Sequence, residues 1–397
     1  MPFHCISADS HLEVRPDLYT PRVPRKYRDH APRVLTLHDG TLAVLVEGKP
    51  MERLISNISC GKPFEDRHPF DPLPGDNFET SPGTGPPEQR VREQDEDGVE
   101  AEVLFPGNNG PSFWRGIKND DAFKAVVRAY NDWLAEDYCS YNPARLLGVG
   151  VIPMTNLDDA ITELEHCAKL GLKSVNLNAF PTGQRQPTSE DDKFYAAALD
   201  LRMPLTIHVQ FGFPLRGTPL PPAPSFKYPK TPDPEFAVPD VVGQRFNKYG
   251  FRGSIQATQL IWSGVFDRFP DLRIYIAEVQ LGWIPMWMET LDFEYTRQRF
   301  WVERVLGLPQ LSRMPSEYAR EHFWWGFQSN PVGVRIAKAE LGLGRSMWSS
   351  DFPHLESDWP HSQQVIEEFS KTITEEEKYQ LVAGNAIEFF HLDGARA

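Results

Sequence analysis

Acidic and imidazole side chains stand at the ends of apolar segments that lie far apart in the sequence. Asp9 and His11 follow a short apolar run, and positions i and i+2 of a strand point to the same side, so both could enter one space. His208 ends the apolar run 203–208, and Asp351 follows the segment 346–350. Imidazole nitrogens and carboxylate oxygens bind zinc, iron and manganese. Together these four residues form a candidate metal site.

Each of these residues also has an ordinary structural interpretation. Asp9 could cap a turn, and His11 or His208 could be a buried histidine with satisfied hydrogen bonds. The metal site is favoured over these structural roles because three separate segments each end in a potential ligand.

Further ionisable residues accompany the candidate ligands. Glu278 ends the apolar segment 272–278 and could be a ligand, a general base or an ion-pair member. His354 lies three residues after Asp351 and could transfer protons. Glu13 follows His11 by two positions but is equally well explained as a solvated loop residue, so we leave it outside the candidate set.

Two residues are candidates for contacting a substrate. Arg115 has a planar guanidinium that could clamp a carboxylate, although a surface ion pair is the commoner role of an arginine. Trp325 could line a pocket with neighbouring tryptophans, although aromatic residues at strand ends usually belong to the core. A small organic or aromatic acid is the substrate class that we expect.

The elements that must position these residues alternate along the chain. Short apolar segments are each followed, except the first, by a helix-like stretch, which is typical of parallel strands joined by crossover helices. One such helix begins near Asp159 and should stop at Gly171. The eight apolar segments are 3–9, 101–106, 146–152, 173–177, 204–210, 272–278, 322–328 and 346–350. Eight repeats predict an α/β fold, a (β/α)8 TIM barrel, with the candidate ligands at its catalytic end.

We expect residues 1–397 to form one metal-dependent barrel domain with three additions. Residues 12–90 are rich in Pro and Gly and read as an N-terminal insertion or arm. Residues 212–250 hold nine prolines and read as a lid-like loop after strand five. Residues 361–397 read as C-terminal helices that pack on the barrel.

Composition excludes several classes of function. The net charge of −14 and the absence of a Lys/Arg run argue against nucleic acid and anionic membranes as partners. Four cysteines without CxxC spacing, no evident signal peptide and no membrane-length apolar run indicate a cytoplasmic protein. The motifs of serine hydrolases, P-loop proteins and dinucleotide-binding proteins are absent from the sequence.

Several motifs resemble the amidohydrolase superfamily, in its amidohydrolase-related branch, which includes aminocarboxymuconate-semialdehyde, γ-resorcylate and carboxyvanillate decarboxylases. The resemblance runs nearly end to end and rests on the segments 8–13 (ADSHLE), 94–106 (QDEDGVEAEVLFP), 269–273 (FPDLR), 349–354 (SSDFPH) and 384–386 (GNA). These motifs are specific for the fold and weak for the substrate.

The resemblance implies a ligand set with one substitution, and one departure outside that set. Asp9 and His11 correspond to the family's first-strand His-x-His pair, with an aspartate in place of the first histidine, and His208 and Asp351 correspond to its ligands on strands five and eight. Glu278 stands where the better-known decarboxylases have a histidine. The fourth strand offers asparagines in place of the bridging Lys or Glu of dinuclear hydrolases, so a second metal would need other ligands.

Several functions fit this pattern. The first is a metal-dependent hydrolase of a small organic or aromatic acid, in which Asp351 takes a proton from metal-bound water and His354 or Glu278 serves the leaving group. The second is a metal-dependent, non-oxidative decarboxylase, a lyase. The third is a non-haem iron oxygenase with one or two iron atoms, suggested by the many carboxylates, and the fourth is a non-catalytic partner subunit.

The cofactor and assembly are expected only in general terms. The cofactor is a divalent metal ion, zinc, manganese or iron, with a second metal possible. The arm 12–90 and the high aromatic content suggest a homodimer.

Overall fold

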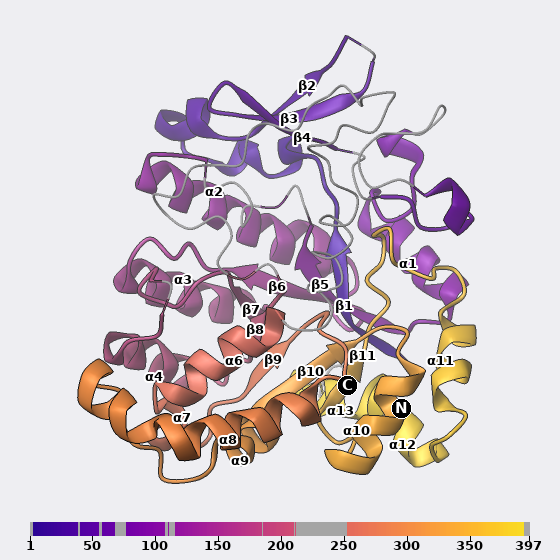
Figure 1. Cartoon of the computed structure of the whole chain (residues 1–397). Helices are drawn as coiled ribbons and strands as arrows, with labels where there is room; N and C mark the ends of the chain where they lie inside the picture. The colour runs from indigo at the N-terminus through magenta and orange to yellow at the C-terminus, as the bar shows by residue number, and fades with distance from the viewer. Residues whose placement is uncertain are drawn as a thin grey trace, which may run out of the picture.

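The computed structural model describes residues 3–38, 40–54, 58–67, 77–107, 110, 116–184, 186–209, 211 and 252–392. Eight parallel strands follow one another around a barrel, with helices on the outside (Figure 1). The strands are β1 (Ile6–Leu12), β5 (Ala101–Pro106), β6 (Leu146–Val151), β7 (Ser174–Leu177), β8 (Leu205–Ile207), β9 (Ile274–Ile276), β10 (Phe323–Phe327) and β11 (Ser346–Trp348). The predicted (β/α)8 barrel is confirmed.

Helices that follow the strands form the outer layer. They are α2 (Asp120–Trp133), α3 (Leu157–Leu170), α4 (Asp192–Asp200), α6 (Arg252–Trp262), α7 (Val265–Arg268), α8 (Ile284–Trp301), α9 (Pro315–His322) and α10 (Pro331–Glu340). The predicted stop of α3 at Gly171 is confirmed, because this glycine has a φ of 79° and closes the helix in the left-handed region. No helix in the described residues is both long enough and apolar enough to span a membrane.

The barrel closes between its first and last strands. The backbone N–H of Asp351 donates to the carbonyl of Asp9 at 3.0 Å, and the N–H of His11 donates to the carbonyl of Phe352 at 2.7 Å. Beneath the strands, α13 (Asn385–Phe389) contributes apolar side chains to the cluster that fills the barrel. Three candidate ligands, Asp9, His11 and Asp351, therefore sit on the seam where the barrel closes.

The first strand differs from its predicted limits of 3–9, because β1 continues to Leu12. Its three polar residues suggested the end of a strand, yet Ser10 and His11 still pair with Leu104 and Phe105 of β5. A buried polar run is possible here because these residues lie at the catalytic end of the barrel, where polar side chains have a use. The hydropathy of the sequence therefore predicted the wrong C-terminal end of this strand.

An irregularity in β1 turns its side chains. Ile6 and Ala8 belong to the apolar cluster inside the barrel, whereas Asp9 and His11 approach His208 across it. Simple alternation cannot place both sets inside, since they differ in parity. The register with β5 shifts between Ser7 and Ser10, and such a bulge re-aims the side chains that follow it.

The additions to the barrel are partly described. Within 12–90, β2 (Arg33–Thr36), β3 (Leu42–Val46) and β4 (Lys49–Arg53) form an antiparallel sheet, followed by α1 (Pro87–Asp97). The C-terminal stretch contains α11 (Ser362–Ser370), α12 (Glu375–Tyr379) and α13. The lid-like loop predicted at 212–250 lies outside the described residues.

Gly326 on β10 leaves room for the chain that follows β9. A β-carbon at this position would lie 2.9 Å from the backbone nitrogen of Glu278, 3.0 Å from the Cα of Ala277 and 2.5 Å from the Oη of Tyr275. The carbonyl of Gly326 also accepts hydrogen bonds from the N–H groups of Val279 and Gln280, at 3.1 and 3.0 Å. A residue without a side chain is thus required beneath the turn that carries Glu278.

We expect Gly326→Ala to lower the free energy of unfolding by about 1–3 kcal/mol, the usual cost of overpacking, because two of the clashing atoms are backbone. Chemical denaturation would measure this loss. Gly344→Ala is the matched control, since a β-carbon at Gly344 would meet nothing within 4 Å. Equal stability of the two variants would contradict the close approach of β10 to this turn.

Candidate metal centre

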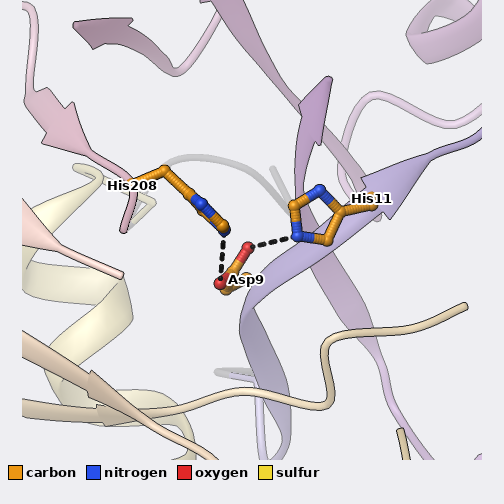
Figure 2. A group of neighbouring side chains, drawn as sticks. All are labelled: Asp9, His11 and His208. Carbon is orange, nitrogen blue, oxygen red and sulfur yellow. Dashed lines mark ion pairs between the residues drawn. The ribbon is translucent and has the colours of Figure 1, made fainter. Parts of the chain in front are cut away.

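The candidate ligands from three parts of the barrel converge on one buried space. Asp9 lies between two imidazoles, with its Oδ1 3.4 Å from Nε2 of His11 and its Oδ2 3.4 Å from Nε2 of His208 (Figure 2). Oδ1 of Asp351 lies 3.1 Å from the same Nε2 of His11. The four side chains are nearly inaccessible to solvent. The structure brings together the residues that the sequence singled out.

His11 is oriented for coordination through Nε2. Its Nδ1 lies 3.3 Å from the carbonyl oxygen of Pro106, which can only accept, so Nδ1 carries the proton and donates. The lone pair is then on Nε2, which faces Asp9 and Asp351. Histidine ligands of metals commonly donate their second nitrogen to a carbonyl in this way. Burial, together with the nearby charge of His354, lowers the pKa of His11 and favours its neutral form.

Glu278 joins the centre from the turn after β9. Its Oε2 lies 3.5 Å from Nε2 of His208, and its side chain is buried. Both Glu278 and Asp351 have a positive φ, 62° and 53°, in the left-handed region that residues other than glycine rarely adopt. Such strained conformations persist where the surrounding structure fixes them, often at functional sites.

His354 bridges two carboxylates. Its Nδ1 donates to Oδ1 of Asp351 and its Nε2 donates to Oε1 of Glu13, both at 3.0 Å. Burial acts to lower the pKa of His354, but Asp351 and Glu13 outweigh burial and raise it well above its ordinary value. Burial acts to raise the pKa of Asp351, but His354 and His11 outweigh it and hold that pKa well below the ordinary value. His354 is therefore an imidazolium with both nitrogens engaged.

The donor set fits a divalent cation. Asp9, His11 and His208 each offer one atom, and these atoms lie within 4.8 Å of one another. Oδ2 of Asp351 is buried and meets no hydrogen-bond partner in the described part of the chain. His11, Asp351 and His354 form a second such group, but the engaged nitrogens of His354 make the first group the better site.

A buried arginine holds the backbone of two candidate ligand segments together. Arg90 of α1 donates from Nη1 to the carbonyl of His11 at 3.0 Å and from Nη2 to the carbonyl of Phe352 at 3.3 Å. Glu102 of β5 accepts two further hydrogen bonds from this guanidinium, at 2.6 and 3.1 Å. Arg90 also lies over the ring of Phe352. The guanidinium of Arg90 therefore connects α1, β1, β5 and the segment after β11.

Not every predicted site residue reaches this centre. Trp325 packs against Trp283, Trp287 and Phe323 in the apolar layer between β10 and the helices, so its position does not support a substrate contact. The neighbouring Trp324, and not Trp325, belongs to the apolar cluster inside the barrel. Arg115 lies outside the described residues.

Glu13 is the residue that sequence reasoning left out. It is buried and contacts His354 beside the seam between β1 and β11. Its spacing was the signal that the sequence offered. Asp9, His11 and Glu13 are two positions apart, so their side chains share one face if the strand continues to Glu13.

Comparisons with known proteins agree with this fold. A family model described as amidohydrolase matches residues 66–392. The chain is 26% identical over 314 residues to gamma-resorcylate decarboxylase of a Polaromonas species, an alignment that covers 77% of this chain and 87% of that protein.

Two solved structures are similar to the whole chain. An amidohydrolase from Mycobacterium avium subsp. paratuberculosis has a TM-score of 0.70 at 15% identity, covering 98% of this chain and 100% of that one. A dihydroxybenzoic acid decarboxylase from a Polaromonas species, crystallised with manganese and the inhibitor 2-nitroresorcinol, has a TM-score of 0.61 at 21% identity, covering 100% and 98%. At these identities the likeness establishes the fold alone.

We expect Arg90→Lys to weaken manganese binding by about 10-fold or more, the loss typical when the support of a ligand is removed. Lysine keeps the charge, but it cannot reach Glu102 and both carbonyls together. Isothermal titration with manganese would measure the change. Arg145→Lys, at a partly exposed arginine that pairs with Asp95, is the control. Unchanged affinity in a folded Arg90→Lys variant would show that this arginine does not position the ligands.

Proposed function

Because this chain belongs to the amidohydrolase family, we propose that it is a metal-dependent decarboxylase of a small aromatic acid. The observation that carries the proposal is the buried convergence of Asp9, His11, His208 and Asp351 at the catalytic end of the barrel. The sequence placed a hydrolase first. The decarboxylase named among the relatives favours the second alternative instead.

We assign the metal to the four converging residues, with Glu278 as a further oxygen donor. Two imidazole nitrogens among several carboxylate oxygens suit manganese, iron or zinc, and the abundance of oxygen favours manganese or iron over zinc. A divalent ion bound here would supply positive charge to hold a carboxylate beside a phenolic oxygen. The dihydroxybenzoic acid decarboxylase described above, a similar structure that was crystallised with manganese, supports that choice.

Proton delivery then falls to Asp351 and His354. In a non-oxidative decarboxylation the bond between the ring carbon and the carboxylate breaks, carbon dioxide leaves, and the ring carbon takes up a proton. His354 holds a proton between Glu13 and Asp351, with Nδ1 3.0 Å from Oδ1 of Asp351. We propose that this proton passes from His354 to Asp351 and from its carboxyl group to the ring carbon. A water molecule restores the proton on His354, and the hydroxide that remains combines with the released carbon dioxide to give bicarbonate.

Two finer points complete the proposal. Arg115 stays our candidate for holding the substrate carboxylate, on the strength of its guanidinium alone. A homodimer stays the expected assembly.

We expect the manganese-loaded protein to release carbon dioxide from γ-resorcylate or another hydroxylated benzoate, without consuming oxygen. His208→Ala should lose bound manganese and at least about 100-fold in activity, since a ligand is removed along with the metal. His166→Ala is the control, because His166 lies on α3 and pairs with Asp132 away from the barrel mouth. Product carbon dioxide and metal content would be measured together.

Other outcomes would favour the alternatives. Hydrolysis of an ester or amide without release of carbon dioxide would return the hydrolase to first place. Oxygen consumption by the iron-loaded protein would favour the oxygenase. Full activity of His208→Ala would contradict the metal centre itself.

A further inference from the structure

A cavity opens at the end of the barrel opposite to the metal centre. It has a volume of about 300 Å³, and its walls come from the segments before β8, β9 and β11 and from the end of α13. Because the strands are parallel, their N-terminal ends lie together, whereas the candidate metal ligands lie toward the C-terminal ends. Ligand pockets of proteins begin at roughly this volume. The cavity, which we call the basal cavity, is therefore large enough for a small ligand.

Positive charge gathers around the basal cavity. The guanidinium and imidazole side chains that line it are those of Arg202, Arg273, Arg345 and His391. Two carboxylates, Asp271 and Glu388, also line it, but neither forms an ion pair with these arginines in the described part of the chain. The net charge of the whole chain is −14, so this concentration of cationic side chains is local. It favours an anionic ligand.

Two of the three arginines have guanidinium groups that are not engaged. Arg273 donates from Nη1 to the carbonyls of Pro270 and Leu272, at 2.6 and 3.0 Å. The side chains of Arg202 and Arg345 make no hydrogen bond or ion pair within the residues that the structure describes. Burial, followed by the charge of Arg345, lowers the pKa of Arg273, so these two cations lie close enough to repel each other. An anion bound beside them would offset that repulsion.

Trp324 forms an aromatic wall of the basal cavity. The Cζ of Arg345 lies over its indole ring, 5.3 Å from the centroid. Phe389 packs against the same indole, with ring centroids 5.4 Å apart, and Met203 and Leu272 add apolar surface. Nε1 of Trp324 is buried and has no acceptor among the described residues, although buried donors normally have one. A flat ring with a polar group would cover this wall better than a compact inorganic anion.

Two residues of the basal cavity adopt strained backbone conformations. Arg202 and His391 have φ angles of 50° and 54°, in the left-handed region. Each follows a helix: the N–H of Arg202 donates to the carbonyl of Leu199 of α4, and the N–H of Leu392 donates to the carbonyl of Ile387 of α13, both at 3.0 Å. Glycine is the usual residue at such positions. An arginine and a histidine in its place favour a use for their side chains.

We propose that the basal cavity binds a small aromatic carboxylate, whose carboxylate group is held by Arg345 and Arg202 and whose ring packs against Trp324 and Phe389. A guanidinium presents paired donors that match the two oxygens of a carboxylate. The acidic residues of the lining disfavour a ligand of higher negative charge. This site is separate from the metal centre and does not depend on the function proposed for that centre.

The test is a titration of the full-length, manganese-loaded protein with 4-bromobenzoate by isothermal calorimetry. This probe carries one carboxylate on a flat ring and lacks the phenolic oxygen that would help to chelate the metal. We expect a dissociation constant of about 1 mM or tighter, which is typical of a ligand of this size. Crystals soaked with the probe should show an anomalous bromine peak beside Trp324. A bromine peak at the metal centre alone, or binding of inorganic phosphate in preference to the probe, would overturn the proposal.

Three variants separate the loss of a binding group from a loss of folding. Arg345→Gln should raise the dissociation constant by about 10-fold or more, the loss typical of a charge-assisted hydrogen bond. Arg202→Gly should raise it by about 5-fold, while its melting temperature stays equal or rises, since glycine tolerates the positive φ. Arg335→Gln, at an exposed arginine of α10 outside the cavity, is the control and should bind like the wild type. Unchanged affinity of both cavity variants, or an equal loss in the control, would contradict the site.

Discussion

The structure depends on negative charge gathered in a space that excludes water. Asp9, Asp351, Glu278 and Glu13 are all buried, and each lies within 3.5 Å of at least one of the three imidazoles of His11, His208 and His354. Carboxylates that lose their hydration repel one another and need compensating charge. His354 supplies one positive charge between Glu13 and Asp351. A divalent cation between the remaining carboxylates and the Nε2 atoms of His11 and His208 would supply the rest.

The protein holds this arrangement in place through strained backbone conformations and through residues that support them. A bulge in β1 turns Asp9 and His11 into the barrel, and positive φ angles aim Glu278 and Asp351. Gly326 lets the turn after β9 approach β10, and Arg90 binds the carbonyls on both sides of the barrel seam. Strain and burial of this kind are tolerated where they preorganise a site.

Most of the fold and most of the candidate site follow from sequence alone. Alternating apolar and amphipathic segments predicted eight strands, and ligand-type residues at their ends predicted which positions would meet. Hydropathy could not find the end of β1, because its polar residues face a functional space and not solvent. The role of Glu13 depends on that continuation, and the place of Trp325 depends on the parity of β10. Neither is visible without knowing which side of a strand faces the barrel axis.

The most direct test of the metal centre is anomalous diffraction at the manganese edge from crystals grown with manganese. We expect a peak about 2.0–2.2 Å from Nε2 of both His11 and His208, with oxygens of Asp9 and Asp351 completing the site. A peak coordinated by His354 in place of His208, or no peak in this space at full manganese loading, would contradict it.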